Sequence, residues 1–346
     1  MTSKQTHLFI GSYTSDNPVG IRAYLFDEAT AQLELLSETG QPNASYLAKH
    51  PGKQILYGVA ESSAEKAKVF AYSIEAGQLH LLNKQAAHGD GPCHVAVHPS
   101  AQAVATANYG SGSVVLYPLL QDGQLAEASS IIQHEGQGQH PSRQKQAHAH
   151  QVVFDASGKT LFACDLGTNK VMMYDINSKA MSLSTSEPAY VALHDGAGPR
   201  HMLFHPNGKD AFVLNELDSS LSHFGYSSGR LELIKTHSTL NEPSSRDNFP
   251  AALRLHPNGN YLYSSNRGHD SIAQFSLANG SLELERLRST EGEWPRDFCF
   301  SPSGNYLFVA NQFSNSLVVF RVDGATGHVA DVVLSLDVPA PVCVCV

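Results

Sequence analysis

The chain has few charged residues and no long apolar runs. Charged residues make up 16% of its 346 residues, and the formal net charge is −9. No segment approaches the roughly 18 apolar residues of a membrane-spanning helix, and the start, MTSKQTHLFIGSYT, has no apolar run of signal-peptide length. Clusters of lysine and arginine, which nucleic-acid-binding surfaces need, are also absent. We therefore expect a cytoplasmic protein that binds neither membranes nor nucleic acids.

Helical periodicity and metal-ligand spacings are missing as well. No stretch repeats apolar residues at i, i+3, i+4 and i+7, which predicts almost no helix. The five cysteines are Cys93, Cys164, Cys299, Cys343 and Cys345. They lie inside strand-like runs without the spacing of a metal site. We expect reduced thiols and a protein without a metal or other cofactor.

The sequence does contain an internal repeat. Five segments align with hardly a gap and begin at His94, His150, His201, Ala251 and Asp297. A looser copy begins at Tyr46. Each copy predicts three strands: a run of alternating apolar and polar residues, an aromatic-rich run after a turn such as HPNG, and a third run after a polar turn. A fourth strand, such as LELIKTH, follows. Repeats of this length built from short strands are typical of β-propellers.

Seven aromatic residues each stand at the end of a third run. Their number indicates seven repeat units. The aromatic residues are Tyr24, Tyr72, Tyr117, Tyr174, Phe224, Phe275 and Phe320. The first unit lacks an opening strand, whereas the last segment, 340–346, is an opening strand with no unit after it. We expect these two parts to pair and close a ring. The prediction is one all-β domain over residues 1–346, a seven-bladed β-propeller of four-stranded antiparallel blades; a β-sandwich array would not explain the two incomplete units.

Two recurrent positions are expected to be structural. In such blades the HPNG-type turns lie on one face, and the heads of opening strands lie on the other with the tails of second strands. The histidines before the turns are His50, His98, His205 and His256. The recurrent caps at second-strand tails are Asn108, Asp165, Asn215, Asn266 and Asn311.

Functional candidates come from positions that vary between blades. The column after the caps reads Tyr109, Leu166, Glu216, Arg267 and Gln312. The heads of the opening strands add His94, His148, His150, Arg200, His201 and Arg296. Several guanidiniums beside imidazoles near the axis would form a cationic pocket for a carboxylate or phosphate. The alternative is a set of salt bridges that only ties the blades together. Two longer connections, 134–149 and 241–249, also lie at blade entrances and are candidates for functional loops.

With these residues, the chain resembles the lactonase family of seven-bladed propellers, which includes bacterial 6-phosphogluconolactonases. The resemblance covers nearly the whole chain and rests on GAGPRHMLFHPNGKDAFVLNELDSS, HAHQVVFDASGKTLFACDLGT, YSSNRGHDSI and WPRDFCFSPSGNYLFVANQ. The same scaffold is similar to fungal carboxymuconate-lactonizing enzymes. The resemblance implies that His150 and Glu216 are acid/base residues and that Arg200 and Arg267 bind anions. In the HAH segment, either His148 or His150 could be the catalytic histidine. Alignment with the other strand heads favours His150.

The resemblance implies hydrolysis of a sugar-derived lactone, with 6-phosphogluconolactone of the pentose phosphate pathway as the expected substrate. A neutral imidazole, that of His150, would activate water with help from Glu216, while Arg200 and Arg267 stabilise the oxyanion. The substrate-binding candidates are His94, His148, His201, Arg296 and Gln312. A carboxylate among arginines is a poor calcium site, in keeping with a metal-free enzyme. The alternatives are another lactonase or lactonizing cycloisomerase for a carboxylate substrate and a non-enzymatic binding propeller; the sequence predicts no oligomeric state.

Overall fold

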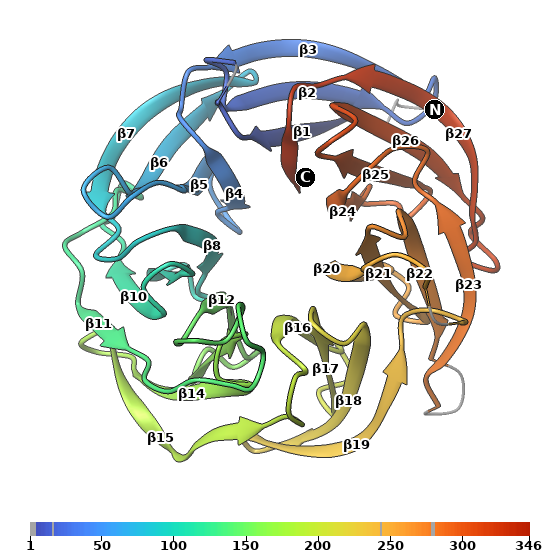
Figure 1. The fold of residues 1–346 in the computed structure, drawn as a ribbon. Coiled ribbons are helices and arrows are strands. Elements are labelled where there is room, and N and C mark those ends of the chain that lie inside the picture. The colour runs from blue at the N-terminus through green and yellow to red at the C-terminus, as the bar shows by residue number, and fades with distance from the viewer. Residues whose placement is uncertain (1–4, 16, 243, 278–280) are drawn as a thin grey trace.

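The computed structural model describes residues 5–346 except 16, 243 and 278–280. The described residues form seven four-stranded antiparallel sheets, arranged as blades of a ring around a common axis (Figure 1). None of these residues lies in a helix, and so none forms a helix able to cross a membrane. The prediction of an all-β seven-bladed propeller is confirmed.

The blades have the following strands, named from the axis outward. Blade 1 contains β28 (Pro341–Cys345), β1 (Gln5–Ser12), β2 (Ile21–Asp27) and β3 (Gln32–Thr39). Blade 2 contains β4 (Ala44–Lys49), β5 (Ile55–Ala60), β6 (Lys68–Glu75) and β7 (Gln78–Ala86). Blade 3 contains β8 (Pro92–Val97), β9 (Ala103–Asn108), β10 (Ser113–Pro118) and β11 (Ser130–Gln133). Blade 4 contains β12 (Ala149–Phe154), β13 (Thr160–Asp165), β14 (Lys170–Asn177) and β15 (Ser182–Ala192).

The remaining three blades follow the same order. Blade 5 contains β16 (Pro199–Phe204), β17 (Asp210–Asn215), β18 (Ser220–Ser227) and β19 (Arg230–Ser238). Blade 6 contains β20 (Phe249–Leu255), β21 (Tyr261–Arg267), β22 (Ser271–Ser276) and β23 (Glu283–Ser289). Blade 7 contains β24 (Pro295–Phe300), β25 (Tyr306–Asn311), β26 (Ser316–Val322) and β27 (Val329–Asp337).

The hydrophobic core lies between neighbouring blades. All seven closing aromatics of the third strands are buried. At the boundary between blades 1 and 7, for example, Phe26 meets Tyr306 and Phe308 edge-on, with ring centroids 4.9 Å apart in both pairs. Clusters of buried side chains of this kind lie at all seven boundaries between neighbouring blades, so each sheet stabilises the next one.

The ring closes in blade 1, where β28 pairs with β1 in the register Phe9↔Cys345 and Ile10↔Val344. The backbone N–H of Val344 also donates to Oδ2 of Asp297 in blade 7, at 2.9 Å. The last strand is thus joined to both the first and the seventh blade. The expected pairing of the two incomplete units is confirmed.

The recurrent turn histidines have the expected structural role. Nε2 of His98, His205 and His256 lies 2.8, 2.9 and 3.1 Å from a glycine carbonyl oxygen in the far-face turn of the next blade. The recurrent caps also form local bonds; Asn108 Nδ2 donates to the Ala87 carbonyl and to Ser113 Oγ, both at 3.0 Å. All five cysteines are free thiols.

A β-bulge at the head of the opening strands positions the side chains near the axis. The pairing register with the second strand shifts around Val342, Ser45, Cys93, His150, Arg200, Ala251 and Arg296. A bulged residue leaves the regular alternation of the strand and its side chain is redirected. The bulge thus gives every blade one variable position at the same end of the ring.

Removal of residues 341–346 should open the ring. Val342, Cys343 and Val344 are buried, and their loss should lower the free energy of unfolding by about 4 kcal/mol or more. Urea unfolding followed by circular dichroism would measure the change. Leu35→Ala, on the half-exposed outer strand β3, is the control and should cost no more than about 0.5 kcal/mol. A truncated chain as stable as the full one would contradict this account of closure.

Candidate active site

A pocket of about 320 Å³ lies at the bulge end of the ring axis. Its lining residues are Tyr13, Glu61, Cys93, Tyr109, Arg143, His150, Glu216, Arg267 and Arg296. With one exception they come from two positions of the repeat. Cys93, His150 and Arg296 are bulge residues of opening strands, and the others stand at or just after the ends of second strands. The exception is Arg143, which belongs to the 134–149 connection.

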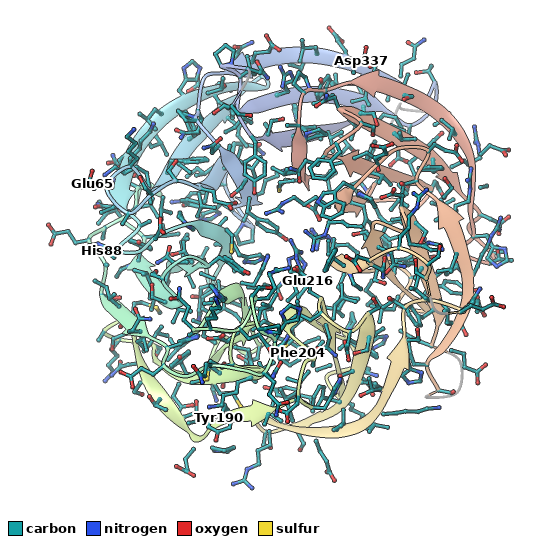
Figure 2. All side chains as sticks on the ribbon, in the orientation of Figure 1. Glu65, His88, Tyr190, Phe204, Glu216 and Asp337 are labelled. Atoms are coloured by element: carbon teal, nitrogen blue, oxygen red, sulfur yellow. The ribbon has the colours of Figure 1, made fainter. Side chains whose placement is uncertain are left out.

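The carboxylate of Glu216 is the centre of the polar network, close to the ring axis (Figure 2). Its Oε2 pairs with Arg200 Nε at 2.9 Å and with Arg267 Nη2 at 2.7 Å, and its Oε1 pairs with Arg143 Nη2 at 2.5 Å. The side chain is buried. These guanidiniums hold the pKa of Glu216 well below its usual range although burial acts to raise it. Glu216 is therefore a permanently charged carboxylate.

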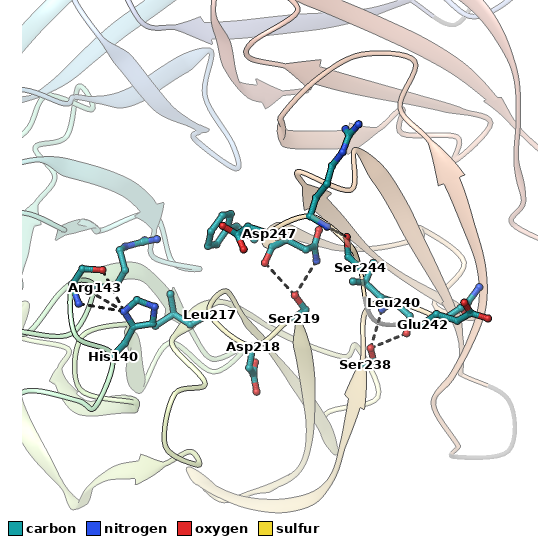
Figure 3. Close-up of a pocket in the computed structure, with 15 residues that line it drawn as sticks. His140, Arg143, Leu217, Asp218, Ser219, Ser238, Leu240, Glu242, Ser244 and Asp247 are labelled. Carbon is teal, nitrogen blue, oxygen red and sulfur yellow. Dashed lines mark hydrogen bonds between the residues drawn. The ribbon is translucent and has the colours of Figure 1, made fainter.

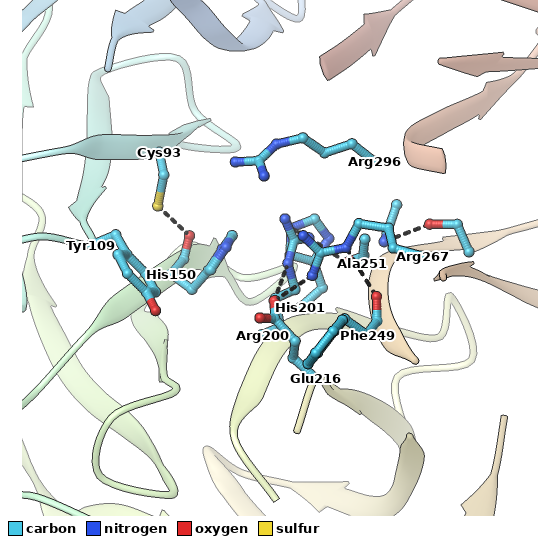
Figure 4. A network of polar contacts seen from close by, with 12 residues as sticks. Cys93, Tyr109, His150, Arg200, His201, Glu216, Phe249, Ala251, Arg267 and Arg296 are labelled. Carbon is cyan, nitrogen blue, oxygen red and sulfur yellow. Dashed lines mark hydrogen bonds and ion pairs between the residues drawn. The ribbon is translucent and has the colours of Figure 1, made fainter. Parts of the chain in front are cut away.

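Further hydrogen bonds fix the two buried arginines. Arg267 Nε donates to the Phe249 carbonyl at 2.9 Å. Arg200 donates through Nη1 to the Ala251 carbonyl and to Nε2 of His201. Because a guanidinium only donates, His201 Nε2 must be the unprotonated nitrogen of its ring. Figure 4 shows Arg200 and Arg267 converging on Glu216.

The third partner of Glu216, Arg143, is held in place by its loop. Asp165 binds both ends of the 134–149 connection: Oδ2 lies 2.6 Å from His134 Nδ1, and Oδ1 accepts the backbone N–H of His148 at 2.9 Å. Arg143 Nη2 also donates to the phenol of Tyr109 at 3.2 Å. Asp165 therefore serves as a cap, as predicted, and in addition anchors a loop that delivers a charge to the pocket.

Arg296 is less tightly engaged than the other three arginines. Among the described residues its nearest carboxylate is that of Glu61, with 3.8 Å between Nη2 and Oε2. Its guanidinium lies over the ring of Tyr13, 5.3 Å from the centroid, and Tyr13 donates to Glu61 at 3.0 Å. Figure 4 shows Arg296 extending toward Cys93 and His150, across the pocket from Glu216.

His150 is the only imidazole among the residues that line the pocket. Burial lowers its pKa well below the usual value, and Arg200 lowers it further, so the ring is neutral near pH 7. Its Nδ1 has no hydrogen-bond partner among the described residues. That nitrogen is buried, so a bound molecule would reach the neutral ring from its pocket side.

The other predicted site residues lie behind the pocket surface. His201 and His94 are buried beneath His150, with ring centroids 5.7 Å apart for His150–His201 and 5.8 Å apart for His94–His201. His148 stacks on Tyr109 at 4.4 Å, and its Nδ1 lies 2.8 Å from the Tyr109 carbonyl oxygen. The structure thus brings His150, and not His148, to the pocket.

Two more predicted residues, Arg200 and Gln312, are not in the pocket lining. Arg200 reaches the site only through Glu216. The backbone N–H of Gln312 donates to the Trp294 carbonyl, and its side-chain oxygen is buried without a partner among the described residues.

Sequence reasoning missed four lining residues: Tyr13, Glu61, Cys93 and Arg143. Tyr13 and Glu61 continue the variable column into blades 1 and 2, because each directly follows the second strand of its blade. Extending the column through the two less regular units would have found both. Cys93 was expected only to be a reduced thiol inside a strand-like run, and Arg143 lies in an insertion that no other blade repeats.

The pocket carries an excess of positive charge. Its lining contains three guanidiniums, those of Arg143, Arg267 and Arg296, and two carboxylates, those of Glu61 and Glu216; Arg200 pairs with Glu216 from behind the lining. Within the described part of the chain, no group of three or more His, Cys, Asp or Glu residues has the geometry of a metal site. An incoming anion would therefore meet arginines.

A larger cleft of about 840 Å³ lies beside the pocket, between the 140–143 segment, the 217–219 turn and the 238–249 segment (Figure 3). Arg143 lines both the cleft and the central pocket. The side chain of Arg143 therefore lies between the cleft and the central pocket.

Comparison with known proteins agrees with this geometry. The family model "Lactonase, 7-bladed beta-propeller" matches residues 7–346. The chain belongs to this lactonase family. The 6-phosphogluconolactonase of Bacillus subtilis (strain 168) is 35% identical to it over 97% of both chains, and that of Formosa agariphila is 34% identical over 92% of this chain and 93% of the relative. The structure of the periplasmic gluconolactonase of Pseudomonas aeruginosa has a TM-score of 0.94 to this lactonase-family propeller at 31% identity, covering 99% of this chain and 98% of that one. The expected family and its class, a carboxylic-ester hydrolase of lactonase type, are confirmed.

The buried histidines predict a loss of stability in mild acid. The pKa values of His94, His150 and His201 are all lowered, mainly by burial. Below about pH 6.5 the unfolded chain takes up protons that the folded chain does not. Each histidine should therefore reduce the free energy of unfolding by up to about 1.4 kcal/mol per pH unit as the pH falls from 6.5 toward 5. Urea unfolding at pH 7.5, 6 and 5 would measure this.

The control for this prediction is His94→Gln, which removes one titrating group away from the pocket lining. The free energy of unfolding of this variant should fall less steeply with decreasing pH than that of the wild type, and the difference should equal the contribution of one histidine. Equal stability of the wild-type protein at pH 7.5 and pH 5 would show that these imidazoles are not buried in neutral form.

Proposed function

We propose that the protein hydrolyses 6-phosphogluconolactone to 6-phosphogluconate. The observation that carries the proposal is the loosely paired Arg296, which faces the neutral His150 across a pocket lined by more guanidiniums than carboxylates. A phosphate group carries close to two negative charges near neutral pH. Relatives over 90% or more of this chain are named 6-phosphogluconolactonase, which supports this choice of substrate.

In this proposal the phosphate binds to Arg296. Its contact with Glu61 is long, at 3.8 Å, so an incoming phosphate would displace little. The other three arginines already have a carboxylate partner at 2.5 to 2.9 Å. The lactone ring then lies between Arg296 and His150, within reach of Arg267 and Arg143.

His150 acts as the general base. Its imidazole takes a proton from water, the water oxygen bonds to the lactone carbonyl carbon, and the carbonyl oxygen becomes an oxyanion. Arg267 and Arg143, whose guanidiniums line the pocket, donate hydrogen bonds to that oxyanion. The carbon–oxygen bond of the ring then breaks, and the imidazolium returns its proton to the departing hydroxyl oxygen. The product is an open-chain carboxylic acid that ionises at neutral pH.

Glu216 holds the arginines in position and does not exchange protons. With three guanidiniums on one carboxylate, its pKa is too low for proton transfer near pH 7. Of the acid/base roles implied by the family resemblance, we therefore assign the proton to His150 and the orienting role to Glu216. Arg200, behind Glu216, fixes this carboxylate from the buried side.

Substrate binding would activate His150. After burial, the influences that lower its pKa are Arg200, Arg296 and Arg267. A bound phosphate offsets these positive charges and raises the pKa of His150. The base is therefore weak in the free enzyme and stronger in the complex with substrate.

A second candidate substrate is an uncharged sugar lactone. The similar structure from Pseudomonas aeruginosa is a gluconolactonase, so gluconolactone belongs in every assay beside 6-phosphogluconolactone and muconolactone. If phosphate recognition by Arg296 is correct, Arg296→Met should selectively raise the KM for the phosphorylated substrate. A cytoplasmic location also remains a prediction, since that relative is periplasmic.

Substitution of His150 or Glu216 should remove most of the activity. His150→Ala should lower kcat/KM by about 10² to 10⁴-fold, since a general base contributes this much. Glu216→Gln should lower it as well and should also reduce the free energy of unfolding by about 3 kcal/mol, because buried guanidiniums lose their partner. Initial rates corrected for spontaneous lactone hydrolysis would measure both effects.

The matched control is His205→Gln, a far-face turn histidine, whose kcat/KM should equal that of the wild type. Circular dichroism must show that every variant is folded. If His150→Ala and Glu216→Gln both retained wild-type kcat/KM, the assignment would be wrong. If His148→Gln lost activity and His150→Ala did not, the base would be His148.

The pH profiles should reveal the change in His150. The acid limb of kcat, which reports the enzyme–substrate complex, should lie at higher pH than the acid limb of kcat/KM, which reports the free enzyme. With gluconolactone, which brings no negative charge, the two limbs should coincide. Coincident limbs for the phosphorylated lactone would mean that its charge does not act on the base.

A further inference from the structure

Trp294 has a positive φ at a repeat position where blades 3 and 5 have glycine and blades 1 and 2 have Ala340 and Asn43, also with positive φ. The residue before the opening strand is Gly91 in blade 3 and Gly198 in blade 5, with φ of 60° and 64°. In blade 7 it is Trp294, with φ of 63°. A bulky side chain rarely adopts positive φ, because its Cβ crowds the backbone.

The equivalence of these positions rests on hydrogen bonds. The carbonyl oxygens of Gly91 and Gly198 each accept the backbone N–H of the first residue after the second strand, at 2.8 Å. The carbonyl of Trp294 accepts the N–H of Gln312 in the same way, at 3.0 Å. Trp294 is also the only tryptophan in the chain.

The indole of Trp294 lies between the guanidinium of Arg267 and the ring of Phe313. The guanidinium carbon of Arg267 lies 5.3 Å from the indole centroid, and Phe313 stacks on the indole at 4.7 Å with an interplanar angle of 18°. Phe249, whose carbonyl accepts a bond from Arg267, approaches at 6.0 Å. Blade 7 thus contributes an aromatic wall to an arginine that belongs to blade 6.

The backbone of Trp294 is tied to the same arginine. Its N–H donates to Asp270 Oδ1 at 2.8 Å, and Oδ1 also accepts the N–H of Gly268 at 3.2 Å. Asp270 and Gly268 form the turn that follows Arg267 in blade 6. Both the side chain and the main chain of Trp294 therefore act on the end of β21 that carries Arg267.

We propose that Trp294 is a positioning residue that holds the guanidinium of Arg267 in its working orientation in the pocket. Glu216 and the Phe249 carbonyl bind the edge of this guanidinium, and the indole supports it by a cation–π contact. The remaining N–H groups of Arg267 then stay directed at the substrate. The inference rests on the anion-binding role proposed for Arg267.

The test is a double-mutant cycle on kcat/KM for 6-phosphogluconolactone. Trp294→Gly should lose about tenfold, in the range of a desolvated cation–π contact, and Trp294→Phe should recover most of that loss. In an Arg267→Met background, Trp294→Gly should cause no further loss, since a residue that acts through Arg267 has nothing left to position. Multiplicative losses in the double mutant would overturn the proposal.

Stability measurements separate positioning from a structural role. Gly is the residue that blades 3 and 5 have at this position, so Trp294→Gly should change Tm by less than about 5 °C. The matched control is Tyr190→Ala, which removes another aromatic from a cation–π contact, with Lys170, at the outer edge of blade 4; its kcat/KM should not change. A large fall in Tm for Trp294→Gly, with activity lost only in proportion to unfolded protein, would overturn the proposal.

Fluorescence gives a readout that does not require turnover. Because Trp294 is the sole tryptophan, emission excited at the indole reports on this contact alone. Arg267→Met should shift the Trp294 emission and increase its quenching by acrylamide in the folded protein, and Tyr190→Ala should do neither. Unchanged emission in Arg267→Met would overturn the positioning role. Absence of lactone hydrolysis by the wild type, with the emission changes present, would overturn the proposed function and leave the Trp294–Arg267 contact established.

Discussion

A single buried carboxylate determines how the centre of this propeller is assembled. Glu216 pairs with Arg143, Arg200 and Arg267, which come from the loop before blade 4, from blade 5 and from blade 6. Without it, the two buried guanidiniums of Arg200 and Arg267 would repel each other and the partly buried Arg143 at high cost, since unpaired charges in a protein interior are strongly destabilising. The same interaction that organises the pocket therefore also ties three consecutive parts of the ring together.

Burial, reinforced by the positive field of the arginines, explains the state of the histidines. His94, His150 and His201 are buried and face arginines, so their pKa values are lowered and the rings are neutral. Neutral imidazoles can pack against one another near the axis without mutual repulsion. The lining of the pocket nevertheless keeps more guanidiniums than carboxylates.

Much of the fold could be predicted because its signals are local. Turn sequences, alternating runs and closing aromatics recur in each blade, and two incomplete units at the ends indicated ring closure. The repeat also separated structural from variable positions, which identified Glu216, Arg267, His150 and Arg296.

The rest of the site depended on features that a repeat does not show. Tyr13 and Glu61 lie in the two blades whose sequences align least well, and Arg143 lies in an insertion with no counterpart to align. Alignment of the strand heads already favoured His150 over His148, whereas the β-bulge that gives His150 its place at the pocket has no clear sequence signature. That Arg200 is screened by Glu216 follows from packing between blades, which spacing along the chain does not report.

The closure by β28 also sets the order in which the active site can mature during synthesis. Domains begin to fold from their N-terminal part while the chain is still being made, and blades 2 to 7 can pack one upon another as they emerge. Blade 1, however, lacks its innermost strand until residues 341–345 have been translated. Tyr13 of blade 1 meets Arg296 of blade 7 across this last boundary. In a nascent chain this side of the pocket is therefore incomplete until β28 has been added.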